Sequence, residues 1–449
     1  MSWVTVSKSG SLLLVGLLAA AACANDESSS TNKQPTSETD TDAGSTTLDG
    51  AAPDGGSSDA GKEGGSEDAA VDADAAVPTC SKEGWCRLAL PSNAGKATLV
   101  GVWGDGQGTV WAVSTEGNIL RWDGTSWTVA RPGTDPLYAI WGSGPTDLWV
   151  SSAAGILHGS GSSSASLAWT LTPLDSLPGD LTTTFGTIGG TSPTNIWIAG
   201  FREHNVNGFG YSVSRVLRYL GPGSNPAWAL ETDLSTGDTL PPDTFSRSQW
   251  TKVLGTSSGD VYVVGRARGI NQPDPDLKFP ASVKHRDVHP DGTAVWTEMY
   301  NSITPNWDDR TPCWWFMFNA GMPPDGRPSW FPIAAGARGN RIWLASGYNA
   351  ERYAVATFDE MMSSTAWTCD AFSFGDSVAR NAIWVSGENE AWSVGDFGRI
   401  NHFDGTTWKI AAVTATSLPI TQDLLDIWGD DHALWVVGKG IALRKLLNP

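Results

Sequence analysis

The chain has 449 residues, a formal net charge of −19 and 24 tryptophans. The charge argues against nucleic acid as a partner, because an acidic protein repels the phosphate backbone. No stretch beyond the N-terminal residues is long and apolar enough for a transmembrane helix. We therefore expect a folded protein that contacts a membrane only through its N-terminus.

Residues 1–23 are typical of an export signal. Lys8 supplies the positive charge, a short apolar stretch follows, and Ala20-Ala21-Ala22-Cys23 resembles a bacterial lipobox. We expect Cys23 to carry lipid. Ala24 in the next position is typical of lipoproteins sent to the outer membrane or cell surface. An ordinary secretory signal that happens to end at a cysteine is the alternative.

Residues 24–79 are expected to form a disordered linker. They contain thirteen acidic residues, only two lysines, and no Phe, Trp or Tyr. Such a segment cannot bury enough apolar surface to fold, and its charges keep it extended. We expect a solvated tether and no specific cation site.

Residues 80–449 repeat one phrase with tryptophan at fixed places, which predicts four short strands per copy. The second-strand aromatic recurs seven times, at Trp111, Trp149, Trp197, Tyr262, Trp343, Trp392 and Trp435. The fourth-strand tryptophan follows only six of them, at Trp127, Trp169, Trp228, Trp296, Trp367 and Trp408. The last copy lacks it, but Gly84-Trp85-Cys86-Arg87-Leu88 precedes the first copy and matches it. We therefore predict an all-β, seven-bladed propeller of four-stranded antiparallel blades, in which the N-terminal strand completes the last blade.

The repeat resembles bacterial propeller lipoproteins of the broad WD-repeat, YVTN and neuraminidase-repeat group. The segments from Asp123 to Trp127 and from Asp404 to Trp408 resemble the Asp-box turn of the last type. The resemblance implies a propeller fold with blade-packing tryptophans. It does not transfer an activity, because function depends on the site rather than on the fold.

The cysteines predict two disulfides. With Cys23 assigned to lipid, Cys80, Cys86, Cys313 and Cys369 remain, an even number in an oxidising compartment. Three pairings are possible. Sequence proximity favours Cys80 with Cys86, and the shared fifth blade favours Cys313 with Cys369.

Candidate ligand-binding residues lie in long connections that the strand order places on one face of the ring. The longest connection, 300–329, contains Trp307, Asp308, Asp309, Arg310, Trp314 and Trp315. Shorter ones are expected to begin at Arg202, Glu203 and His204, at Arg266 and Arg268, and at Glu351 and Arg352. Aromatic planes beside charges suit a sugar or a protein partner. Two alternatives remain open: the tryptophans form a local core around Cys313, and the charges are only solvated.

The sequence favours a non-enzymatic, monomeric module that binds a protein or a glycan. A glycosidase needs two carboxylates flanking the scissile bond, and only Asp308, Asp309 and Glu203 qualify for that alternative. An envelope assembly scaffold is the other alternative. His285 and His289 are too few to predict a zinc site, so we expect no metal or cofactor.

Overall fold

The structure is a computed structural model, and it describes most of residues 80–447. The ranges that it does not describe within this span are 207–208, 236–246, 257–258, 269–280, 290, 302–333, 346–348, 360–363, 377, 412–413 and 415–418. Residues 1–79 also lie outside the described residues, so the expectations for the signal and the linker stay predictions.

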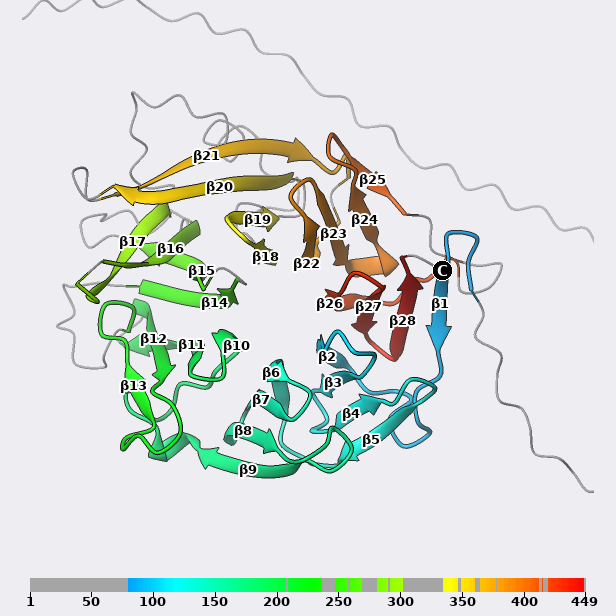
Figure 1. The fold of residues 1–449 in the computed structure, drawn as a ribbon, viewed down its shortest axis with the longest axis horizontal. Coiled ribbons are helices and arrows are strands. Elements are labelled where there is room, and N and C mark those ends of the chain that lie inside the picture. Colours follow the sequence, from blue (N-terminus) through cyan, green and yellow to red (C-terminus); the bar gives the residue numbers. More distant parts are fainter. Residues whose placement is uncertain are drawn as a thin grey trace, which may run out of the picture. The chain divides into compact units, whose positions relative to one another are not determined.

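The described residues form seven four-stranded antiparallel sheets, which we call blades (Figure 1). Six blades each contain four consecutive strands, and one combines strands from both ends of the ring. Blade 1 contains β2 (Leu99–Gly104), β3 (Val110–Ser114), β4 (Ile119–Trp122) and β5 (Trp127–Arg131). Blade 2 contains β6 (Leu137–Gly144), β7 (Asp147–Ser152), β8 (Gly155–Ser160) and β9 (Ala168–Pro173). Blade 3 contains β10 (Thr187–Ser192), β11 (Asn195–Val206), β12 (Phe209–Tyr219) and β13 (Trp228–Leu230). Blade 4 contains β14 (Arg247–Gly255), β15 (Val261–Arg268), β16 (Ala281–Val288) and β17 (Ala294–Asn301). Blade 5 contains β18 (Ala334–Arg338), β19 (Arg341–Ala345), β20 (Asn349–Asp359) and β21 (Ser364–Ser373). Blade 6 contains β22 (Arg380–Gly387), β23 (Glu390–Gly395), β24 (Ile400–Phe403) and β25 (Trp408–Ile410). Two single-turn 3₁₀ helices, η1 (Leu174–Ser176) and η2 (Asp396–Gly398), lie in connections.

The composite blade 7 consists of β26 (Leu424–Gly429), β27 (Ala433–Gly438), β28 (Ile441–Leu446) and β1 (Trp85–Leu88). β1 pairs with β28 in an antiparallel register in which Trp85 lies opposite Lys445. In Figure 1 the N-terminal strand accordingly lies beside the last strand of the chain. The prediction that the N-terminal strand completes the last blade is confirmed.

First strands lie at the centre of Figure 1, and the first strands of blades 7, 1 and 2 contact one another through a tryptophan and a glycine. A Cβ added to Gly104 would lie 2.4 Å from the ring of Trp428, and one added to Gly142 would lie 2.7 Å from the ring of Trp103. Only glycine leaves room for the neighbouring indole at these positions. The blade 7 to blade 1 contact, which closes the ring, thus repeats the contact between blades 1 and 2.

Second-strand aromatics pack against the fourth-strand tryptophan of the next blade. The ring planes of these pairs meet at 73° to 89°, which is the edge-to-face geometry that aromatic rings prefer. The pairs are Trp149 with Trp228, Trp197 with Trp296, Trp343 with Trp408, Trp392 with Trp85, and Trp435 with Trp127. The interpretation of these tryptophans as blade-packing residues is confirmed, and Trp85 occupies the fourth-strand place in blade 7.

Some residues that we expected in connections belong to strands. β11 and β12 form a long hairpin in which Glu203 lies opposite Ser212 and His204 opposite Tyr211. The expectation that a connection begins at Arg202, Glu203 and His204 is therefore wrong, because these residues belong to β11 and the ladder continues to Val206. β15 likewise extends through Arg266 and Arg268, and β20 includes Glu351 and Arg352. Polar residues were misleading here because strands that extend past the blade core have no apolar pattern to maintain.

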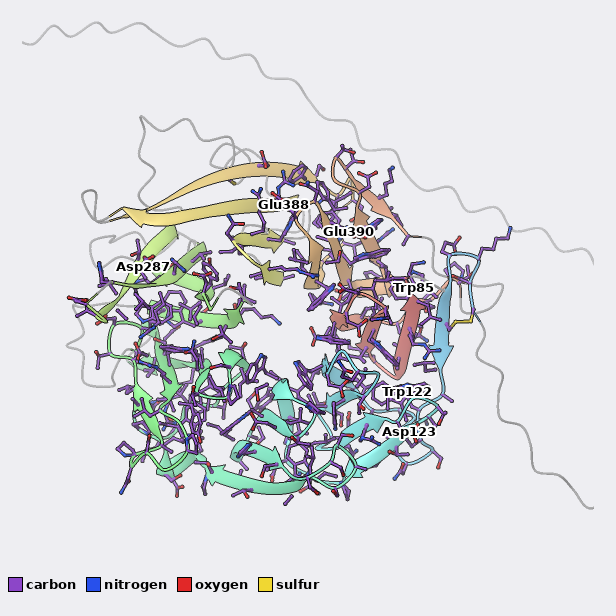
Figure 2. The ribbon with its side chains drawn as sticks, in the orientation of Figure 1. Trp85, Trp122, Asp123, Asp287, Glu388 and Glu390 are labelled. Atoms are coloured by element: carbon purple, nitrogen blue, oxygen red, sulfur yellow. A yellow bond between two sulfur atoms is a disulfide. The ribbon has the colours of Figure 1, made fainter. Side chains whose placement is uncertain are left out.

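The first predicted disulfide is present. Cys80 and Cys86 are bonded, with an S–S distance of 2.03 Å, beside β1 (Figure 2). Cys369 on β21 is also disulfide-bonded. Cys313 lies outside the described residues, so its pairing with Cys369 stays a prediction. In the part of the chain that the structure describes, no helix has the length and apolar character needed to cross a membrane.

Candidate functional site: a groove between the first and last blades

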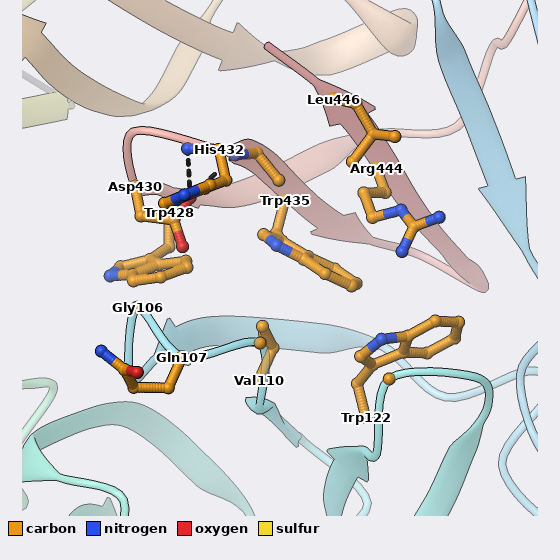
Figure 3. Close-up of a pocket in the computed structure, with 13 residues that line it drawn as sticks. Gly106, Gln107, Val110, Trp122, Trp428, Asp430, His432, Trp435, Arg444 and Leu446 are labelled. Atoms are coloured by element: carbon orange, nitrogen blue, oxygen red, sulfur yellow. Dashed lines mark hydrogen bonds and ion pairs between the residues drawn. The ribbon is translucent and has the colours of Figure 1, made fainter. Parts of the chain in front are cut away.

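A groove of about 520 Å³ lies where blade 7 meets blade 1 (Figure 3). We call it the seam groove. Its lining includes Gln107, Trp122, Trp428, Asp430, Trp435 and Arg444. These residues come from the ends of strands and from the turns that join first to second and third to fourth strands. We call the face that carries these turns the short-loop face, and the opposite face the insertion face.

The apolar floor of the groove is built from the packing tryptophans themselves. Trp435 and Trp122 are 4% and 5% exposed, and their ring centroids lie 5.4 Å apart across the blade boundary. Trp428 is half-buried and presents more of its indole to the groove. The planes of the Trp122 and Trp435 rings meet at 60°, so the floor consists of closely packed indoles at an angle to each other.

One end of the groove is polar. The Asp430 carboxylate accepts hydrogen bonds through Oδ1 from the backbone N–H groups of His432 and Ala433, each at 2.7 Å. These bonds fix the turn through one oxygen of the carboxylate. The exposed Gln107 belongs to the facing turn of blade 1, which the Asp105 side chain holds in the same way. Asp430 and Gln107 therefore place a carboxylate and an amide at the same end of the groove, on either side of the Trp428 indole in Figure 3.

Arg444 lies at the other end of the groove. Its guanidinium carbon is 5.6 Å from the ring centre of Trp435 and 5.5 Å from that of Trp122, so it stacks on both blades. Its Nε is buried and has no hydrogen-bond partner among the described residues. Burial lowers the pKa of the Arg444 guanidinium. The groove thus carries a cation to which no described residue offers a hydrogen-bond acceptor.

A smaller cavity of about 330 Å³ lies on the insertion face, between blades 2, 3 and 4. Tyr138, Phe201 and Trp250 line it together with glycines and threonines. It has no charged residue in its lining, so it offers less to orient a ligand than the seam groove does.

The predicted ligand-binding residues are not brought together among the described residues. Trp307, Asp308, Asp309, Arg310, Trp314 and Trp315 lie outside them. Arg202 donates to Asp180 at 2.6 Å, and its side chain is 22% exposed. The carboxyl group of Asp180 is partly desolvated, which would raise its pKa, but the hydrogen bond from Arg202 and those from nearby threonines lower the pKa overall. Arg202 therefore has a structural partner already.

Glu203, His204, Arg266 and Arg268 occupy strands, as described above, and only their backbone positions are described. Their role in ligand binding stays a prediction.

Sequence reasoning missed the seam groove because every groove tryptophan sits at a repeat position. The assignment of such residues to packing is correct, but at the seam the packing surfaces also line a cavity. The available signal was Arg444 together with Ala433 on the neighbouring strand, an arginine with no acidic residue placed to pair with it.

The lining of the seam groove does not include the pair of carboxylates that glycoside hydrolysis uses. Asp430 is the one carboxylate among the lining residues. Across the described residues, no group of three or more His, Cys, Asp or Glu side chains is placed to hold a metal ion. His285 instead lies between Asp260 and Asp287, at 3.1 and 2.9 Å, and stacks on Tyr262.

No family model and no curated protein sequence matches the chain. Among solved structures, YCF48 from Cyanidioschyzon merolae is similar with a TM-score of 0.51 at 12% identity, over 81% of this chain and 98% of that one. Virginiamycin B lyase from Staphylococcus aureus is similar with a TM-score of 0.47 at 12% identity, over 81% of this chain and 99% of that one. PorZ, a surface component of the Porphyromonas gingivalis type-IX secretion system, is similar with a TM-score of 0.44 at 13% identity. The match covers 76% of this chain and 45% of that one. At these identities the likeness to YCF48 shows the propeller fold and nothing about function.

Proposed function

We propose that this protein is a non-enzymatic binding module of the bacterial cell envelope that captures an extracellular ligand in the seam groove. The observation that supports this most is the groove itself, which combines an aromatic floor, a polar end and an unpaired cation. Pockets that bind small ligands are mostly apolar and carry a few placed polar groups, with volumes of roughly 300 to 1,000 Å³. The single carboxylate favours binding over hydrolysis.

Export and lipid anchoring are part of the same proposal. The lipobox at Cys23 would attach the chain to a membrane, and residues 24–79 would act as a tether. Fractionation tests this directly. A Cys23→Ser variant should leave the membrane fraction while the parent stays in it, and continued membrane association of the variant would contradict lipid anchoring.

The binding site can be tested with three forms of the full exported chain on a glycan array and in pull-down experiments. We expect Trp428→Ala to lose ligand capture, because it removes the most exposed aromatic surface of the groove. A Trp314→Ala/Trp315→Ala variant probes the insertion face, where the sequence predicted the site. If the double variant loses capture and Trp428→Ala keeps it, the site is on the insertion face and the seam-groove proposal fails.

A further inference from the structure

Every blade places a basic side chain opposite its second-strand aromatic. The register pairs Trp111 with Arg121, Trp149 with His158, Trp197 with Arg218, Tyr262 with His285, Trp343 with Arg352, Trp392 with His402, and Trp435 with Arg444. The three histidines stack on their aromatic partners at centroid distances of 3.9 to 4.6 Å. A basic group over an aromatic ring is therefore part of the blade design.

In most blades this basic group has a polar partner inside the protein. Each histidine contacts a carboxylate two residues before the aromatic: Asp147 at 2.6 Å, Asp260 at 3.1 Å and Glu390 at 3.1 Å. Two of the arginines also have partners. Arg121 donates to Ser164 at 2.9 Å, and Arg352 donates to Asp370 at 2.7 Å.

Arg444 differs because the residue two positions before its aromatic is Ala433, which offers no acceptor. Arg218 in blade 3 also has no hydrogen-bond partner among the described residues, although for another reason: the residue two positions before its aromatic is Asn195, whose Oδ1 accepts from Trp197 Nε1 at 2.7 Å. Arg218 lies 5.6 Å from Trp197, as Arg444 lies 5.6 Å from Trp435. Only Arg444 lines the seam groove. Both arginines stack on an indole, and Arg444 alone of the two also faces a cavity. A comparison of Arg218 with Arg444 therefore distinguishes a packing role from a binding role.

We propose, building on the proposed function, that the seam groove binds an acidic sugar whose carboxylate pairs with Arg444. A guanidinium presents N–H donors in a fork that matches a carboxylate, and such charge-assisted pairs are among the strongest hydrogen bonds in proteins. The half-buried indole of Trp428 suits the apolar face of a pyranose ring. Asp430 and Gln107, at the far end, suit the hydroxyl groups of the next sugar, because one accepts and the other both donates and accepts.

The geometry favours a sugar over an acidic peptide. β3 and β27, which line the groove, are second strands, and both edges of each are already paired within their own sheets. A peptide cannot add to them as an extra strand, which is the usual way that β-proteins bind extended chains.

The experiment compares uronic-acid oligosaccharides with their own methyl esters, which keep the shape and remove the charge. Trimers of galacturonate, glucuronate and mannuronate are titrated into the full chain by calorimetry, together with a glutamate decapeptide. We expect at least one acid to bind about tenfold or more tightly than its ester. Arg444→Gln should reduce that ratio to about one, and Arg444→Lys should keep part of it.

Arg218→Gln is the matched control, because it removes the same stacking contact without touching the groove. We expect it to lower thermal stability about as much as Arg444→Gln does and to leave the acid-to-ester ratio at the parent value. The inference is overturned if no acid is preferred over its ester, if the preference survives Arg444→Gln, or if only the glutamate peptide binds through Arg444. Loss of capture in Trp428→Ala without any preference for acids would keep the proposed function and remove this inference.

Discussion

Two halves of the ring join their blades in different ways. In blades 6, 7, 1 and 2 the inner strand carries a tryptophan, at Trp384, Trp428, Trp103 and Trp141, and its indole lies on the next blade. Blades 3, 4 and 5 have Gly189, Leu254 and Gly336 at the equivalent positions. One ring therefore contains two kinds of blade boundary.

Without the tryptophan, backbone approaches backbone. A Cβ added to Gly189 would lie 2.6 Å from the carbonyl oxygen of Val253, and one added to Gly255 would lie 2.1 Å from that of Gly190. The indole thus acts as a spacer between inner strands, and glycine-to-backbone contact replaces it in the other half. That second half also carries the extended hairpins β11–β12 and β20–β21. The site follows the same division, because the seam groove lies between two tryptophan-containing blades.

Removal of β1, the strand that closes the ring, should lower stability more than any single substitution does. It acts on the half of the ring whose inner strands carry a tryptophan. Deletion through Pro91 removes Trp85, which is 1% exposed and packs on Trp392, and it removes the strand that pairs Cys86 with Arg444. Loss of one buried tryptophan alone costs about 3 to 5 kcal/mol. We expect a sharp fall in the thermal midpoint by calorimetry.

A deletion that ends at Val77 is the control, and it should melt like the parent because it keeps β1. Equal melting of the two truncated forms would show that β1 does not close the ring.

Adding one methyl group to a boundary glycine should distinguish the two kinds of boundary. Gly104→Ala meets the Trp428 ring at 2.4 Å, whereas Gly255→Ala meets the Gly190 carbonyl oxygen at 2.1 Å. Overpacking costs about 1 to 3 kcal/mol. We expect Gly255→Ala to be the more damaging, because an indole can shift and a backbone carbonyl cannot. The measurement is the free energy of urea unfolding.

Gly144→Ala is the control, since no atom lies within 4 Å of the added Cβ, and it should change stability by less than about 0.5 kcal/mol. Combining Gly104→Ala with Trp428→Leu should cost less than the sum of the two single changes, because the smaller side chain relieves the clash. Strict additivity would contradict the spacer role of Trp428.

The sequence was sufficient for the blade pattern and insufficient for the site, for a physical reason. Four strands per blade and the displaced strand at Trp85 follow from residue spacing, which the period of the repeat preserves. The seam groove depends on residues about 300 positions apart, and the spacing of the repeat does not show that their packing surfaces also enclose a cavity. Arg202 shows the converse: its role in ligand binding stays a prediction, and its ion pair with Asp180 involves a residue 22 positions away that no repeat spacing indicates.

The smallest expected effect concerns Asp426, which links the ends of the ring by accepting a hydrogen bond from the backbone N–H of Val102 at 2.9 Å. Burial raises the pKa of this carboxyl group, and attraction to Lys252 and the backbone bonds only partly offset the rise. The folded state therefore holds the proton more tightly than the unfolded chain does. The resulting stabilisation is complete below the pKa of the unfolded chain, about 3.9, and is lost as the pH rises through the folded pKa.

An Asp426→Asn variant keeps an acceptor for Val102 and cannot ionise. We expect its free energy of urea unfolding, relative to that of the parent, to increase as the pH rises from 4 toward 8. Asp423→Asn is the control with the opposite sign, because the hydrogen bond from Lys439 lowers the pKa of Asp423 and its stabilisation is lost as the pH falls. At neutral pH the free energy of unfolding of Asp423→Asn should therefore be lower than that of the parent. A difference between Asp426→Asn and the parent that stays constant with pH would mean that the seam carboxylate ionises as freely as an exposed one, and that the two ends of the ring are not held by a buried acid.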